Sequence, residues 1–108
     1  MEKLAKVNQH HIEQFAYFLD RLQATPDGDG TLFDHMLMLY GCGISDGNQH
    51  LHVNLPVLLA GGRLKGGRHL RVAEGTPLTN LQLTLLDKLG VPTEQLGDST
   101  GQLAHLSV

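Results

Sequence analysis

One stretch of the chain, residues 43–52, holds the side chains with the clearest capacity for chemistry. It carries one carboxylate, Asp46, and two imidazoles, His50 and His52. Because alternate side chains of an extended backbone project to the same side, the two imidazoles are expected to lie together. One carboxylate and two imidazoles suit zinc or another divalent metal ion. The stretch therefore predicts a metal site formed by Asp46, His50 and His52, with zinc, manganese or calcium as the candidate ion.

The same residues have a second interpretation. Asp46-Gly47-Asn48 is also a sequence typical of a tight turn, because aspartate and asparagine hydrogen-bond to nearby backbone and glycine adopts unusual backbone angles. A pair of histidines on such a loop would then simply point into water. Both interpretations remain open on the sequence alone.

Three further motifs are weaker. Residues 27–31 begin like a calcium-binding loop, but Leu32 stands where glycine is needed and Met38 where glutamate is needed. Residues 61–67 suggest a phosphate cradle but lack its lysine-serine/threonine ending, so we expect a glycine turn at 65–68 with strand-like pieces such as 69–72 beside it. Cys42 has no histidine or cationic neighbour in sequence and is expected to be a small buried residue.

These residues must be positioned by a few regular elements. Residues 1–25 are predicted to form a long amphipathic helix, because apolar residues recur at helical spacing and no proline or glycine interrupts positions 2–25. Proline and two glycines then end it within 25–30. The members of its apolar stripe are Leu4, Val7, Ile12, Phe15, Leu19 and Leu22.

Residues 35–75 form the predicted strand region. Two apolar runs, 36–40 and 55–60, each end in glycine and resemble strands of a parallel sheet that are buried on both faces. The loop 43–52 would then leave the carboxyl end of a parallel strand, where α/β proteins place their sites. The expected core consists of Phe15, Leu37, Leu39, Val57, Leu58, Leu59, Leu81 and Leu85.

Residues 77–90 are predicted to form a second, capped helix. Thr79 and Gln82 have the spacing of a capping box, and Gly90 followed by Pro92 would end the helix. Its buried stripe is expected to contain Leu78, Leu81, Leu85 and Leu89. Residues 91–108 show only the sequence pattern of a loop and are predicted to form an extended tail. The fold class is therefore α/β, as a single domain over 1–108 or a fragment of a larger one.

Composition excludes several classes of protein. The chain has 108 residues, 41% of them hydrophobic and 18% charged, with a formal net charge of −3. This negative charge argues against non-specific electrostatic binding to nucleic acid or to an anionic membrane. There is no apolar run of ~18 residues that could span a bilayer, and the first residues lack the apolar core of a targeting signal. The single cysteine excludes an internal disulfide.

Several motifs together cover nearly the whole chain: KVNQHHIEQFAYFLDRLQATPDGDGTLFDHMLMLYGCGISDGNQHLHVNLPVLLAGG, GRHL, GTPLTNLQLTLLDKLGVP and GDSTG. This combination closely resembles the C-terminal part of a bacterial family catalogued as domain of unknown function 1552. More distantly, it resembles the alkaline phosphatase and sulfatase superfamily, in which an aspartate-histidine pair follows a buried strand. Asp46 matches the metal-binding aspartate of that pair, whereas Gly47 stands where those hydrolases carry histidine. His50 or His52 would replace the lost ligand or match a later one.

The resemblance implies the C-terminal portion of an alkaline phosphatase-like three-layer sheet. Full-length family members are secreted or periplasmic, whereas this chain shows no targeting signal. The implied function is a segment of a metal-dependent phosphate- or sulfate-ester hydrolase that is inactive alone, because the nucleophile and other ligands lie upstream in that superfamily. The alternative is a non-catalytic binding or assembly module with the same fold. The partners expected are a second copy of the chain or a missing N-terminal portion.

Overall fold

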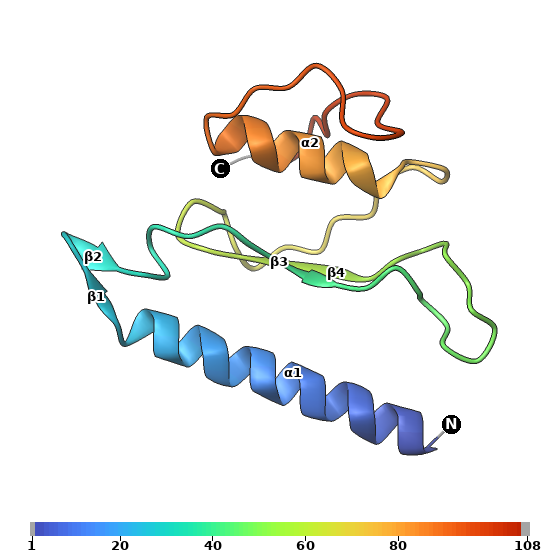
Figure 1. The fold of residues 1–108 in the computed structure, drawn as a ribbon, viewed down its shortest axis with the longest axis horizontal. Helices are drawn as coiled ribbons and strands as arrows, with labels where there is room; N and C mark the ends of the chain where they lie inside the picture. The colour runs from blue at the N-terminus through green and yellow to red at the C-terminus, as the bar shows by residue number, and fades with distance from the viewer. Residues whose placement is uncertain (1, 107–108) are drawn as a thin grey trace. The chain divides into compact units, whose positions relative to one another are not determined.

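A computed structural model describes residues 2–106 and shows a small mixed α/β protein with two helices and two small antiparallel sheets (Figure 1). The chain divides into two compact units, residues 1–64 and 65–108, and each is described by itself. The expected α/β class is confirmed at this level. Residue 1 of the predicted first helix and residues 107–108 of the predicted tail lie outside the described residues.

Helix α1 spans Glu2–Gln23, close to the predicted extent. Glu2 in its first turn and Arg21 in its last have the charges that a helix dipole favours at those ends. The apolar stripe is less buried than expected, since Leu22 is the only buried residue of the described helix. Leu4, Val7, Ile12 and Phe18 all have more than 40% of their surface exposed. Three of the six residues of the predicted stripe, Leu4, Val7 and Ile12, are therefore exposed.

A short hairpin follows α1 and was not predicted. Strand β1 (Pro26–Asp27) pairs antiparallel with β2 (Gly30–Thr31). Gly28 opens the two-residue turn with a φ of 60°, the positive value that a type II′ turn requires at this position. Proline at the first strand position donates no hydrogen bond to the ladder, so it is tolerated there.

The second sheet corrects the predicted parallel arrangement. Strand β3 (Met38–Gly41) pairs antiparallel with β4 (Val57–Ala60), in the register Met38↔Ala60 to Gly41↔Val57. The two strands lie inside the predicted runs 36–40 and 55–60, except that β3 extends to residue 41. Parallel neighbours need a crossover, usually a helix, and residues 42–56 contain none. The loop 43–52 therefore lies at the end of a hairpin.

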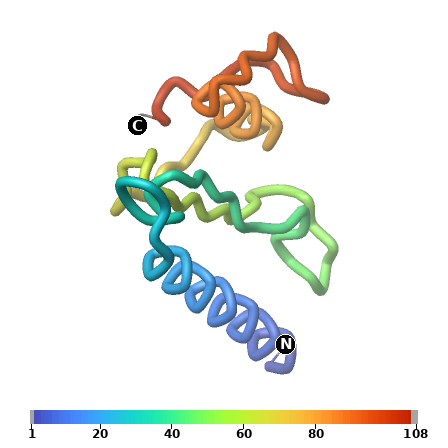
Figure 2. Tube along the Cα trace, turned by 60° about the vertical axis from the view of Figure 1, so that its left-hand side comes forward, coloured from blue at the N-terminus to red at the C-terminus, as the bar shows by residue number. Residues whose placement is uncertain are grey.

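No residue of these strands is buried, and each strand has exposed positions, so the two buried faces expected are not present. Leu39 and Leu58 are 36% and 49% exposed, so both are wrongly placed in the predicted core. Leu39 and Leu58 lie on opposite faces of the sheet, because Leu39 pairs with Leu59 and Leu58 pairs with Tyr40, so each face is only partly covered. On β3, Tyr40 stacks on Phe15 of α1 with ring centroids 4.5 Å apart. In both views α1 runs beneath the hairpin (Figures 1 and 2).

The glycine-rich segment after β4 lacks the strand-like pieces expected beside its turn. Leu64 N–H donates to the carbonyl of Gly61 at 3.1 Å, and Arg68 Nε donates to the carbonyl of Lys65 at 3.0 Å. The first bond closes a backbone turn, the second is made by a side chain, and residues 69–72 contain no strand. The prediction of strand pieces there is wrong because no partner segment supplies a ladder for them.

The second unit is built on α2 (Leu78–Lys88), inside the predicted 77–90. The predicted capping box is wrong, because Pro77 is the N-cap and Thr79 already lies within the helix. The Thr79 hydroxyl instead donates to Asp98 at 2.6 Å. The predicted C-terminal ending is confirmed: Gly90 has a φ of 78°, and Val91 N–H donates to the carbonyl of Leu86 at 3.0 Å, as in a Schellman motif.

The predicted extended tail is wrong, because residues 96–106 fold back on α2. Asn80 accepts a hydrogen bond from Thr100 N–H at 2.8 Å and donates to the Thr100 hydroxyl at 3.0 Å. The Thr84 hydroxyl accepts from Leu103 N–H at 2.8 Å and donates to the carbonyl of Asn80. Leu106 is buried in this unit, as are Leu83 and Leu85 of α2. Leu85 is thus a confirmed core residue.

Truncating Leu85 tests this core. Leu85→Ala should lower the free energy of unfolding by ~2–5 kcal/mol, because it removes buried methyl groups and leaves a cavity. Leu89→Ala is the matched control: Leu89 lies on the same helix end, is 48% exposed and should change stability by ~0.5 kcal/mol or less. Urea unfolding followed by circular dichroism measures both. Equal losses in the two variants would contradict the assignment of the buried face.

Candidate functional site

The predicted loop 43–52 is a small closed turn at the end of the β3–β4 hairpin. Asp46 and Leu51 form an isolated antiparallel bridge. Ser45 N–H donates to the carbonyl of Leu51 at 2.8 Å, and Leu51 N–H donates to the carbonyl of Asp46 at 3.2 Å. The backbone between these residues is thus held in one compact loop, which is the element that positions the predicted ligands.

Asp46 orders the turn with one of its two carboxylate oxygens. Its Oδ1 accepts hydrogen bonds from the N–H groups of Asn48 at 2.9 Å and Gln49 at 3.1 Å. The turn interpretation of Asp46-Gly47-Asn48 is therefore confirmed. No described residue hydrogen-bonds to Oδ2 of Asp46. The turn role and a ligand role are compatible, since the two oxygens are used separately.

His52 is oriented by the backbone at the start of the loop. Its Nδ1 lies 2.6 Å from the carbonyl oxygen of Gly43. A carbonyl only accepts, so Nδ1 carries the proton, and in the neutral ring Nε2 is left with its lone pair. Histidines that bind metals almost always donate their other ring N–H in this way, which fixes the tautomer and the ring orientation.

His50 has a different environment. Its φ of 54° is left-handed, a conformation that costs energy for a residue other than glycine. Its side chain makes no hydrogen bond to a described residue. Over residues 2–106 there is no group of three or more histidine, cysteine, aspartate or glutamate side chains placed to hold a metal ion. The assignment of Asp46, His50 and His52 as ligands stays a prediction.

Gly47 occupies a crowded position. A Cβ built on Gly47 would lie 3.1 Å from Cδ2 of Leu4 in α1. A side chain such as histidine at this position would require Leu4 to move. The glycine thus allows the loop to lie against the start of α1.

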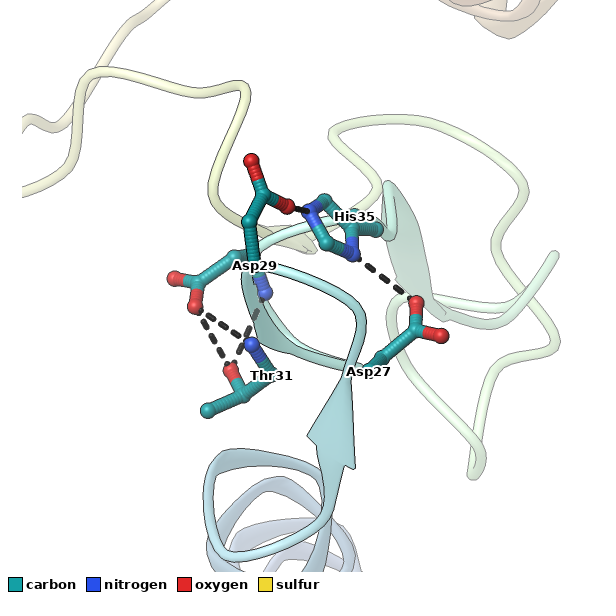
Figure 3. A network of polar contacts seen from close by, with 5 residues as sticks. Asp27, Asp29, Thr31 and His35 are labelled. Carbon is teal, nitrogen blue, oxygen red and sulfur yellow. Dashed lines mark hydrogen bonds and ion pairs between the residues drawn. The ribbon is translucent and has the colours of Figure 1, made fainter.

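The most connected cluster of ionisable groups lies elsewhere, in an acidic turn formed by residues 26–35 (Figure 3). His35 contacts two carboxylates: Nδ1 lies 2.8 Å from Asp27 Oδ2, and Nε2 lies 3.1 Å from Asp29 Oδ1. Both ring nitrogens can donate only when the imidazole is protonated. The hydrogen bond to Asp27, with the charges of Asp27 and Asp29, raises the pKa of His35 above its ordinary value, against a smaller opposing effect of desolvation.

Asp34 stabilises the same turn through hydrogen bonds to Thr31. Its Oδ2 accepts from Thr31 N–H at 2.8 Å and from the Thr31 hydroxyl at 2.9 Å. These hydrogen bonds, the backbone one first, lower the pKa of the Asp34 carboxyl. The two nitrogens of His35 point away from each other, so Asp27 and Asp29 cannot share one ion with it. The arrangement is an ion-pair clamp rather than a metal site.

Sequence reasoning missed this clamp, although a signal exists. The turn sequence Asp27-Gly28-Asp29-Gly30 allows a two-residue hairpin, and that hairpin presents both carboxylates to a residue a few positions later.

The prediction for Cys42 is also wrong: its thiol is exposed and donates to the carbonyl of Ile44 at 2.9 Å. Cys42 follows Gly41, the last residue of β3, and therefore lies beyond the paired part of the sheet.

Comparison with protein-family models, with curated proteins and with solved structures gives no match to this chain. In the described part of the chain, no helix is both long and apolar enough to cross a membrane.

The clamp predicts a pH dependence of the acidic turn. Folding raises the pKa of His35, so its protonated ring stabilises the folded turn. This stabilisation is complete below pH 6.5, the ordinary pKa of histidine, and is lost as the pH rises through the higher pKa of the folded state. A histidine titration by NMR should place the midpoint of His35 above the ordinary value of 6.5. Asp27→Asn should lower the midpoint of His35. A midpoint unchanged by this substitution would contradict the clamp.

Proposed function

We propose that the chain is a C-terminal segment of a metal-dependent hydrolase-like protein of the phosphatase/sulfatase type. In this proposal Asp46, His50 and His52 supply ligands for a divalent ion, zinc, manganese or calcium. The remaining ligands and the nucleophile come from another polypeptide segment, so residues 1–108 alone are inactive. The bound metal would polarise the ester oxygen and activate a hydroxyl nucleophile.

The observation that carries this proposal is the hydrogen bond from His52 Nδ1 to the Gly43 carbonyl. It leaves Nε2 as the free nitrogen of a ring whose orientation is set, which is the preparation that metal-binding histidines share. The uncommitted Oδ2 of Asp46 lies on the same ten-residue loop. A carboxylate oxygen and an imidazole nitrogen are both ordinary zinc ligands.

The fold is compatible with a larger sheet. Strands β3 and β4 pair only with each other among the described residues, so each has one unpaired edge. An exposed edge is a template for further strands, and many large α/β sheets contain an antiparallel pair. We propose that the hairpin belongs to the three-layer sheet of the alkaline phosphatase-like fold and that the exposed face of α1 is covered there.

Zinc binding by the chain without a polyhistidine tag tests the metal assignment. Isothermal titration with zinc, and in parallel with manganese and calcium, should show binding that weakens about tenfold or more in His52→Ala, because a ligand is removed. Asp46→Ala and His50→Ala should weaken it as well. His11→Ala is the control, since it removes an exposed imidazole from α1.

Circular dichroism separates loss of a ligand from loss of the fold in these variants. Binding that is absent, or that survives both Asp46→Ala and His52→Ala unchanged, would overturn the proposal that this loop holds the metal.

A second function, a non-catalytic assembly module, is favoured by the exposed apolar face of α1. Val7 and Ile12 are 49% and 44% exposed in a helix whose other side is polar. Apolar patches of this kind mark protein interfaces. In this reading the chain associates with a second copy or with the segment that completes its sheet, and binds no metal.

Sedimentation equilibrium at tens of micromolar tests the assembly function. The assembly function predicts dimers or larger species, and Ile12→Lys should shift them toward monomer by placing a charge in the apolar contact. Gln14→Lys adds the same charge at a polar, exposed position of α1 and should leave the association unchanged. A monomeric wild-type chain with a cooperative melt would exclude self-association.

A further inference from the structure

Charge is unevenly distributed along this acidic chain. Residues 47–73 contain no aspartate or glutamate, yet they hold Arg63, Lys65, Arg68 and Arg71, half of the eight lysine and arginine residues. Although the formal net charge of the chain is −3, this segment is cationic and lies between two acidic segments. An anion that the whole chain would repel can still be attracted here, because charges further than about 8 Å away are largely screened at physiological salt.

The part of this segment in the second unit, Lys65–Arg71, is fully accessible. Every residue from 65 to 75 is exposed, and none belongs to a helix or strand. Neither Lys65 nor Arg71 forms an ion pair with a described carboxylate. Arg68 Nε donates to the carbonyl of Lys65, so this side chain lies back along the loop. Lys65 and Arg71 therefore lie at the two ends of an exposed loop that bends at Gly67.

The backbone of this loop also offers hydrogen-bond donors. The N–H groups of Gly66 and Gly67 have no acceptor among the described residues. A Cβ built on either glycine would meet open space, and Gly67 has a φ of 70°. Successive N–H groups around a residue with positive φ form concavities that bind anions. Both glycines are exposed, so a ligand can reach this part of the backbone from solvent.

We propose that residues 65–71 bind a tetrahedral oxyanion, a phosphate or sulfate group. The ammonium of Lys65 and the guanidinium of Arg71 supply charge, and the N–H groups of Gly66 and Gly67 supply neutral donors. Phosphate and sulfate oxygens are strong acceptors, and charge-assisted hydrogen bonds to them are shorter and stronger than neutral ones. A small anion fits better than a nucleic acid, because Glu74 follows the segment directly and would repel a long polyanion.

This anion site stands on its own observations and does not need a metal at residues 43–52. The titration is therefore done with EDTA present, so that failure of the metal proposal leaves its outcome unchanged. If both proposals hold, the oxyanion class agrees with a phosphate- or sulfate-ester substrate.

Titration of the isotope-labelled chain with inorganic phosphate, and separately with sulfate, tests the site by NMR. At constant ionic strength, the amide signals of Gly66 and Gly67 should shift along a saturating curve, whereas equivalent chloride should not shift them. Lys65→Gln and Arg71→Gln should each weaken binding about fivefold, a size expected for a charged hydrogen-bond donor at an exposed site. Lys88→Gln, which removes a cation from the end of α2, should bind as the wild type does.

The relative affinities for phosphate and sulfate decide which of the two the site prefers. Shifts that fail to saturate, that appear equally with chloride, or that persist in both Lys65→Gln and Arg71→Gln would overturn the inference. The spectra of the variants also show directly whether each remains folded.

Discussion

The first unit depends on the close approach of two stretches of backbone at the end of β4. Gly61 and Gly62 lie directly against residues 34–36, so that a Cβ on Gly61 would collide with the carbonyl of Met36 and one on Gly62 with the backbone of Asp34. Gly61 also has a φ of 139°, which side chains rarely allow. Gly62 N–H donates to the carbonyl of Phe33 at 2.9 Å across this contact. Any side chain here would separate the strand from the turn.

This contact joins the two polar regions of the unit to one scaffold. The acidic turn lies at the end where Gly62 meets Asp34, and the loop 43–52 lies at the opposite end of the same hairpin. In each region, side chains satisfy local backbone or carboxylate groups: Thr31 binds Asp34, and Asp46 binds the amides of its own turn. Both regions are therefore ordered by short-range bonds, which a small unit with little core can provide.

The second unit replaces a large core with polar contacts between a helix and the segment that follows it. Asn80 and Thr84 are buried and hydrogen-bond to Thr100 and Leu103. A buried polar group that is fully paired costs little, whereas an unpaired one is expensive. Among residues 2–106, no buried side-chain nitrogen or oxygen lacks a partner. These contacts hold residues 96–106 on α2 although few apolar side chains are buried there.

The sequence by itself determined the elements whose signals are local. Helical spacing predicted α1 and α2, glycine and proline predicted the end of each, and two apolar runs predicted β3 and β4, because these depend on residues within a few positions of one another. Strand direction, the exposure of Leu39 and Leu58 and the return of residues 96–106 depend on contacts between distant segments. The same holds for His35: its two carboxylates become neighbours only when β1 and β2 pair. Tertiary structure decided these features, because burial and ion pairing are properties of what packs together and periodicity describes one segment alone.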